Sequence, residues 1–492
     1  MKFFKTLSDK ISHLSSSDIV FKIDSREELL TGLYLFIIFI LCFIKLDNFI
    51  LPQLDDMTHA AMGASILQTG DWFTMHEGAV ISWLKPPLYF WAEAILFKIF
   101  EVSEYWSKFP VAITGFLTFL FSYKLAEKLF GKRVGFLTLF VLSTSMFFLR
   151  YTQRVMLDMP VTFALTLSIF AVVKAEKDNN DKFYLLYGLG LAFGYYFKGL
   201  QGLYALGIIP LYFIVTGQFK KLFNSYFLLS ILEALFLMGL WAVPQYLTHG
   251  KAFLLSQSGI GPLLSGGLAG HTNPFYRPFK EFFRMFYWFI PALYGMYLAL
   301  TRLGNKDERN GFIILFLWFS IILAALSVSS VFGVRYLIPA LVPAGIFAAI
   351  ALNHFIKPKQ FLYFQHTACL IACGILILIA VLPVPPVKKG TEYISLYRCV
   401  NNIVSKNSKI ILYKEKSYIF NQGLTFYSAR PLDKQVQAAE DLISEVNNTE
   451  KKVFIISNPE DYEEIKEIVA AERLFIFASS DKWILFQIDK GS

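Results

Sequence analysis

Cysteine and charge are both scarce in this chain of 492 residues. Three of the four cysteines, Cys42, Cys369 and Cys373, stand in apolar runs, and only Cys399 lies in a more polar region. The chain can therefore assemble neither a disulfide framework nor a four-cysteine zinc site. Charged residues make up 17% of the chain and hydrophobic residues 55%. This composition is too apolar for an ordinary soluble protein and indicates a protein of the lipid bilayer.

The motifs of several large enzyme classes are missing too. The chain contains no GxGxxG, no Walker sequence, no nucleophile elbow and no HExxH, so nucleotide-driven transport and standard hydrolase chemistry have no motif support. The first 30 residues show no apolar region directly after the basic residues and no small-residue cleavage site. We therefore expect no cleaved signal peptide, and the first membrane helix acts as the insertion signal.

Long apolar runs, in contrast, are frequent. A helix needs about 20 residues to cross ~30 Å of hydrocarbon, and eleven runs approach that length: 29–46, 111–129, 134–151, 159–174, 183–197, 199–216, 225–247, 283–301, 311–329, 333–356 and 361–383. The basic clusters between them alternate so that all fall on one side, the cytoplasm. This explains the net charge of +9 without a nucleic-acid partner. We predict a polytopic α-helical membrane protein with about 11–13 transmembrane helices and a cytoplasmic N-terminus.

Most polar groups fall on the opposite, outer side, above all in the loop 47–110. Residues 55–69 and 88–100 have helical patterns but are too short to span the bilayer. We expect two helices that lie in the membrane interface and cover the outer ends of the membrane helices.

The composition changes after residue 386. Strand-like runs alternate with polar helical stretches, as in a small α/β domain. We expect strands over 410–413, 453–457, 474–478 and 483–488, and helices around 433–446 and 459–471. The predicted division is a cytoplasmic segment 1–28, a membrane domain 29–386 and a soluble outer domain 387–492.

Three carboxylates are candidate catalytic residues. Asp55 and Asp56 follow the first apolar run, and Asp158 stands between two runs in QRVMLDMP. The aspartate pair suits either a helix cap or a general base, because one carboxylate can orient the other. Asp158 could form a salt bridge with Arg150 or Arg154, but ionisable groups at the edge of a span tend to mark a site.

The candidate phosphate-binding groups lie on the same side. Lys85 stands in WLKPP, where two prolines exclude a regular helix. Lys198 ends a run of 15 residues, about 22 Å as a helix, so it should lie below the membrane surface and need an anionic partner such as a lipid phosphate. Arg335 and Tyr336 open the tenth run. All of these residues could instead anchor the chain at the lipid headgroups.

Two histidines are weaker candidates as substrate contacts, metal ligands or bases. His59 lies in DDMTH and His271 in GGLAGHTNPFYRPF. A lone histidine in a loop is more often none of these, so both rank below the lysines.

Six stretches resemble, in the same order along the chain, the sequence motifs of the bacterial membrane glycosyltransferases with the GT-C fold. The group includes the undecaprenyl-phosphate aminoarabinose transferases of lipid A and the protein O-mannosyltransferases. The stretches, spread over residues 30–345, are DDMTHAAMGASILQTGDWF, WLKPPLYFW, QRVMLDMP, YYFKGL, HTNPFYRPF and RYLIPALVPAG.

The resemblance implies a polyprenyl-phosphate sugar as donor and inverting attack at the anomeric carbon, at the outer face of the bacterial inner membrane. It implies Asp55 as the catalytic carboxylate and Asp158 as the second acidic position. Lys85, Lys198 and the Arg335-Tyr336 pair match the positions that hold the donor phosphate. The implied acceptor is lipid A or a related glycolipid, or a protein hydroxyl.

This chain departs from the family at two places. Glu-Lys-Pro-Pro is usual where it has Leu84-Lys85-Pro86-Pro87, and Asp-Glu where it has Asp55-Asp56. The first change removes a carboxylate associated with a metal near the site. No cofactor is therefore assigned, and a divalent metal stays an open alternative.

Two rival functions remain. A flippase or transporter of polyprenyl-linked sugars should show charged or broken-helix positions at the midplane and an inverted repeat, and the sequence shows neither. A non-catalytic membrane scaffold would not explain why Lys85 precedes two prolines or why Lys198 is expected to lie below the membrane surface.

Overall fold

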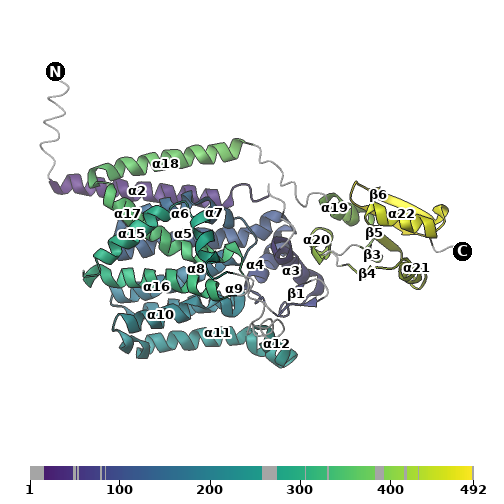
Figure 1. The fold of residues 1–492 in the computed structure, drawn as a ribbon, viewed down its shortest axis with the longest axis horizontal. Coiled ribbons are helices and arrows are strands. Elements are labelled where there is room, and N and C mark those ends of the chain that lie inside the picture. Colours follow the sequence, from purple (N-terminus) through teal and green to yellow (C-terminus); the bar gives the residue numbers. More distant parts are fainter. Residues whose placement is uncertain are drawn as a thin grey trace, which may run out of the picture.

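The computed structural model describes residues 16–47, 51, 55–77, 80–83, 85–257, 274–304, 306–329, 332–382, 393–414, 418–429 and 432–489. Long helices run side by side in one bundle, and a small α/β domain lies beyond one end of it (Figure 1). All eleven predicted apolar runs are mainly helical in their described residues, but the run 134–151 is divided between two helices at Ser145 and the run 283–301 is divided between Met285 and Phe289. The bundle helices are α2 (Ser16–Phe43), α5 (Glu104–Phe130), α6 (Lys132–Thr144), α7 (Met146–Tyr151), α8 (Asp158–Lys177), α9 (Tyr184–Lys198), α10 (Tyr204–Val215), α11 (Ser225–His249), α15 (Phe289–Thr301), α16 (Lys306–Val328), α17 (Ile338–Phe355) and α18 (Pro358–Val381).

Not every bundle helix is long enough to cross a membrane alone. Within the described ranges, six helices have the length and apolarity to do so. The segments Asp181–Gly202 and Tyr204–Val215, bent by 95° at their junction, make a seventh when taken together. This bend is a break in a helix that the sequence analysis did not predict. Others are short: α15 has 13 residues, about 20 Å at 1.5 Å per residue.

Helix α8 forms the centre of the bundle. Its membrane-length window is 94% buried, and it packs against α5, α9 and α17. The contact with α9 is close, since a Cβ on Gly190 would meet the Ser168 hydroxyl at 2.2 Å. The two helices are antiparallel and joined by the short 3-10 helix η1 (Asp181–Phe183). The first residue of α8, Asp158, therefore lies at the same end of the bundle as the last residue of α9, Lys198.

Three of the predicted basic clusters, 124–133, 174–182 and 220–221, meet at the opposite end of the bundle. Lys128 and Lys174 both pair with Asp178, and Lys221 pairs with Glu176 at 2.6 Å. These three clusters therefore share one end, as the alternation of charge requires. Which compartment this end faces stays a prediction.

Helices α3 (Asp55–Thr69) and α4 (Leu88–Phe100) cover the residues expected to be helical in the first long loop. A two-stranded hairpin of β1 (His76–Glu77) and β2 (Val80–Ile81) lies between them in sequence. Helix α4 exposes an apolar stripe that includes Ile95 and Ile99, as expected at a membrane interface. Helix α3 differs from the expectation because most of it is buried. It packs between α4 and a helix of the C-terminal domain, so other protein segments, not lipid, cover it.

The C-terminal domain is a five-stranded sheet in the order β4-β3-β5-β7-β6. Strand β3 is parallel to β4 and β5, and β7 is antiparallel to β5 and β6. Alternate residues of β3 enter two separate apolar clusters, so helices cover both faces. The elements are α19 (Ile394–Ile403), β3 (Lys409–Tyr413), α20 (Tyr418–Ser428), β4 (Lys434–Val436), α21 (Ala439–Asn447), β5 (Val453–Ser457), α22 (Pro459–Ile468), β6 (Leu474–Ser479) and β7 (Ile484–Ile488).

All four expected strands of this domain are present. The expected helix over 433–446 is only partly right, because residues 434–436 instead form β4, an edge strand that pairs with β3. Strand pairing is a tertiary contact that overrides the local pattern. Helices α19 and α20 were not predicted.

Helix α20 docks the C-terminal domain onto α3. The Gln68 amide donates to the main-chain oxygen of Thr425 at 2.8 Å. The Tyr427 hydroxyl donates to Glu104 at 2.8 Å. Phe426, between them, belongs to the apolar core of the membrane domain. The C-terminal domain therefore contacts the same helix whose first residue is Asp55 (Figure 1).

Candidate active site

Asp158 lies at the centre of an ion cluster at the end of the bundle where α8 begins and α9 ends. Its side chain is only 5% exposed. Lys198 Nζ contacts Asp158 Oδ1 at 2.6 Å, and Arg335 Nε lies 3.3 Å from Oδ2. Arg335 is brought here by the 3-10 helix η5 (Val334–Leu337), which precedes α17. Three segments far apart in sequence thus supply one buried carboxylate and two cations.

Asp55 extends this cluster toward solvent. Its Oδ2 lies 2.5 Å from a terminal nitrogen of Arg335, and its side chain is 42% exposed. No other described residue bonds to it. Asp55 and Asp158 therefore share one guanidinium, but only Asp55 is accessible. It is the carboxylate best placed to meet a nucleophile that approaches from outside.

Tyr336 provides an aromatic surface for both cations. Lys198 Nζ lies 4.2 Å from the ring centroid and the Arg335 guanidinium carbon 4.9 Å. Arg335 also donates to the Tyr336 hydroxyl at 3.3 Å. Cation–π contacts hold charge without neutralising it, so the cations remain available to an anionic ligand.

Asp56 has a different environment from its neighbour. Its side chain is fully buried, and both of its oxygens accept from the Arg154 guanidinium. The Val155 N–H donates to it as well, at 3.0 Å. Asp56 therefore ties the start of α3 to the segment before Asp158. Arg154, which the sequence suggested as a partner for Asp158, pairs with Asp56 instead.

His59 supports the same segment from one helical turn further along α3. Its Nδ1 lies 2.7 Å from the Val155 carbonyl oxygen, to which it donates. Burial and, next, the charge of Lys85 hold the pKa of His59 well below its ordinary value. The ring is therefore neutral.

Lys85 lies at the edge of the cluster. Its ammonium is 3.9 Å from Glu77 in β1. Burial lowers the pKa of Lys85, while the carboxylates of Glu77 and Asp55 oppose the shift. The Glu77 contact is long, so Lys85 is the least firmly paired of the three lysine and arginine groups assigned to phosphate. Sequence reasoning missed Glu77, which has no distinctive motif around it.

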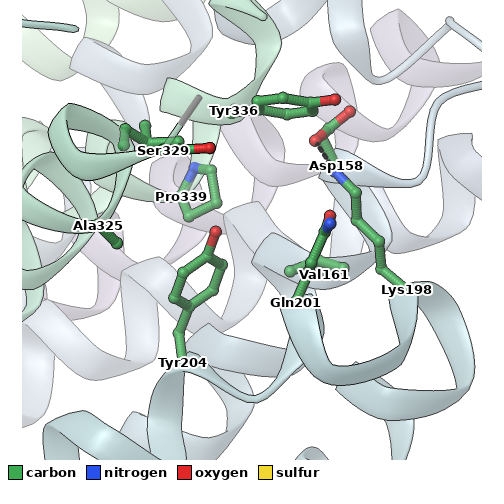
Figure 2. A pocket seen from close by; sticks show the side chains of 10 residues that line it. Asp158, Val161, Lys198, Gln201, Tyr204, Ala325, Ser329, Tyr336 and Pro339 are labelled. Atoms are coloured by element: carbon green, nitrogen blue, oxygen red, sulfur yellow. Dashed lines mark hydrogen bonds and ion pairs between the residues drawn. The ribbon is translucent and has the colours of Figure 1, made fainter. Parts of the chain in front are cut away.

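A pocket of about 160 Å³ opens beside Asp158 and Lys198. Figure 2 shows Asp158 and Tyr336 at its rim and the Tyr204 hydroxyl pointing into the ring of lining residues. The pocket is lined by Asp158, Val161, Lys198, Gln201, Tyr204, Ala325, Leu326, Ser329, Tyr336 and Pro339. The sequence singled out only three of these.

The charges of the cluster balance one another. Asp55 and Asp158 hold Arg335 and Lys198, and Glu77 faces Lys85. A phosphate that takes the place of the carboxylates at these cations would keep their charges satisfied. It would also release Asp55 from Arg335. The arrangement can thus bind an anionic leaving group and free a carboxylate to act as a base.

The candidate metal ligands do not come together in the described part of the chain. No group of three or more His, Cys, Asp or Glu side chains there is placed to hold a metal ion. His271 lies outside the described residues.

Comparisons with known proteins agree with the motif resemblance. The family model of dolichyl-phosphate-mannose-protein mannosyltransferases matches residues 84–242. The undecaprenyl phosphate-alpha-4-amino-4-deoxy-L-arabinose arabinosyl transferase 1 of Proteus mirabilis (strain HI4320) is 23% identical over 336 residues, which cover 64% of this chain and 58% of the relative. An uncharacterized protein of Aquifex aeolicus (strain VF5) is 25% identical over 296 residues, 60% of this chain and 58% of its own length. The matches thus span less than two thirds of both relatives.

Solved structures extend the likeness to nearly the whole chain. ArnT from Cupriavidus metallidurans, bound to undecaprenyl phosphate, superposes with a TM-score of 0.77 over 92% of this chain and 97% of that chain, at 15% identity. The Archaeoglobus fulgidus oligosaccharyltransferase in complex with Zn and sulfate gives a TM-score of 0.56 over 94% and 73%, at 12% identity. The polytopic helical fold and the resemblance predicted from the motifs are confirmed at the level of the fold. The chain is therefore a multi-pass membrane protein of the GT-C fold class.

Proposed function

We propose that this protein is a glycosyltransferase that moves a sugar from a polyprenyl phosphate to lipid A or a related glycolipid, at the outer face of the inner membrane. The observation that carries the proposal is the ion cluster, in which Lys198 and Arg335 share the buried Asp158 and Arg335 reaches the accessible Asp55. A site with two partly buried cations and one accessible carboxylate suits the departure of a phosphate and the approach of a nucleophile. The N-terminus and the basic end of the bundle would then face the cytoplasm.

The reaction needs no nucleotide. The acceptor oxygen attacks the anomeric carbon as the bond from that carbon to the phosphate oxygen breaks, with inversion. The electron pair leaves with the polyprenyl phosphate, and Lys198, Arg335 and Lys85 stabilise its charge. If the acceptor is a hydroxyl, its proton goes to Asp55. If the acceptor is a phosphate of lipid A, it is already ionised, and Asp55 only orients it.

A protein hydroxyl is the alternative acceptor. The match to the mannosyltransferase family model favours it. The Proteus mirabilis relative is named only by its donor, and the lipid acceptor comes from the resemblance of the motifs to the aminoarabinose transferases. Both alternatives use the same donor chemistry at the same cluster.

Mass spectrometry of cells with and without the gene tests the function. We expect lipid A to lose the mass of one sugar in the deletion strain and to regain it when the intact chain is restored. A loss from peptides instead would move the acceptor to protein hydroxyls. If neither pool changes while polyprenyl-linked sugar accumulates on the inner leaflet, the protein is a flippase and the transferase proposal fails.

Lys85 makes donor binding depend on pH. Burial lowers its pKa below the ordinary value of 10.5, whereas a bound phosphate favours the charged form and raises it. Affinity for undecaprenyl phosphate is therefore highest at pH values below the pKa that Lys85 has without bound lipid. The affinity falls as the pH rises through this lowered pKa, which is at a lower pH than for an exposed lysine.

Binding of undecaprenyl phosphate, titrated from pH 7 to 10.5 in detergent, checks this expectation. The Lys85→Arg variant is the control, because a guanidinium stays charged across this range, and its affinity should change less with pH. Equal pH profiles for the two proteins would show that Lys85 does not hold the phosphate.

A further inference from the structure

The pocket opens directly on the ion cluster. The pocket lining includes Asp158, Lys198 and Tyr336 but neither Asp55 nor Arg335. A donor whose phosphate rests on Lys198 can therefore place its sugar in the pocket.

Two polar side chains in the pocket have no partner in the described part of the protein. The Tyr204 hydroxyl and the Gln201 amide make no hydrogen bond to any other described residue. Tyr204 begins α10, and Gln201 lies in the 3-10 helix η2 (Gly199–Gly202) directly after Lys198. Both groups donate and accept. An apolar chain laid over them would desolvate them without replacing their hydrogen bonds.

The remaining surface fits a ring with both polar and apolar faces. Val161, Leu326 and Pro339 give the pocket an apolar wall. The pocket has a volume of about 160 Å³. Its mixture of polar and apolar groups suits a monosaccharide, whose hydroxyl or amino groups would pair with the polar side chains.

We propose that this pocket holds the sugar of the donor, and that Gln201 and Tyr204 determine which sugar is accepted. The proposal rests on the proposed function, because it takes the donor phosphate to lie on Lys198. The polyprenyl chain must then leave the cluster by another route. Gln201 and Tyr204 are specificity-determining residues that no motif indicates.

Binding of three lipids to the purified full-length protein tests the assignment. The probes are undecaprenyl phosphate without a sugar, undecaprenyl phosphate-4-amino-4-deoxy-L-arabinose and undecaprenyl phosphate-mannose. Tyr204→Phe and Gln201→Met each remove hydrogen-bonding groups with little change of volume. Tyr226→Phe, in α11 and outside the pocket, is the matched control.

We expect Tyr204→Phe, at a half-buried hydroxyl, to weaken binding of the preferred sugar-bearing lipid by about tenfold. Gln201→Met, at an exposed amide, should weaken it less. Affinity for bare undecaprenyl phosphate should change less than twofold. The ratio of affinities for the two sugars should also shift, which a general loss of folding would not produce. The control variant should match the wild type for all three lipids.

Other outcomes overturn the assignment. An equal loss for bare and sugar-bearing lipids would mean that the pocket holds the phosphate or the polyprenyl chain. Unchanged binding of all three lipids by both variants would mean that the sugar lies elsewhere. If the wild type binds none of the three lipids, the proposed function itself fails, which is distinguishable from a failure of the pocket assignment alone.

Discussion

Replacing Asp55 by asparagine is expected to lower the rate of sugar transfer to a hydroxyl acceptor by about 100- to 10,000-fold, the usual contribution of a general base. Asparagine keeps the size of the side chain but cannot take a proton. Affinity for undecaprenyl phosphate should not fall, because Lys198 and Arg335 remain and asparagine no longer competes with the phosphate for Arg335. The loss should thus appear in the rate constant and not in donor binding.

The size of this effect also identifies the acceptor. A phosphate acceptor is already ionised, so the asparagine variant should lose much less activity with lipid A than with a serine- or threonine-containing peptide. Transfer assays with purified protein and undecaprenyl phosphate-4-amino-4-deoxy-L-arabinose measure both. Glu77→Gln is a useful comparison, because it removes a carboxylate that faces Lys85 at 3.9 Å and not the acceptor. Wild-type rates for Asp55→Asn with both acceptors would contradict a catalytic role.

Replacing Asp56 by alanine should instead destabilise the fold, by about 3 kcal/mol, the lower part of the range for breaking a buried ion pair. Asp56 is fully buried, and its removal leaves Arg154 and the Val155 N–H without their acceptor. The Arg154 side chain is 21% exposed, so water compensates part of the cost. Because the Arg154 segment leads into α8, the position of Asp158 should loosen as well.

Thermal unfolding in detergent, with a double-mutant cycle, measures this effect. The Asp56→Ala, Arg154→Ala double variant should be less destabilised than the sum of the two single changes, because neither charge is then left unpaired. Asp55→Ala is the adjacent control, and it should change stability little because a half-exposed ion pair is screened by water. Equal unfolding temperatures for Asp56→Ala and Asp55→Ala would contradict the structural role of Asp56.

The contrast between the two neighbouring aspartates could not be read from the sequence. Both follow the same apolar run, and the pattern places both in the first turn of a helix, where carboxylates favour the positive end of the helix dipole. Which of them faces Arg154 and which faces Arg335 depends on how α3 is rotated against α8 and η5. That rotation is set by packing with α4, α5 and α20, and none of these contacts is local.

The sequence by itself determined the polytopic helical fold, the bounds of α3 and α4, the gathering of three basic clusters at one end and the segments that carry the candidate site. These features depend on local composition and on periodicity, because a helix needs about 20 apolar residues to cross the bilayer. Only the tertiary structure decided that Asp158 pairs with Lys198 and Arg335, that α20 covers α3, and that Gln201 and Tyr204 line a pocket with Asp158. Such pairings join residues far apart along the chain, and their side chains meet only after the helices have packed.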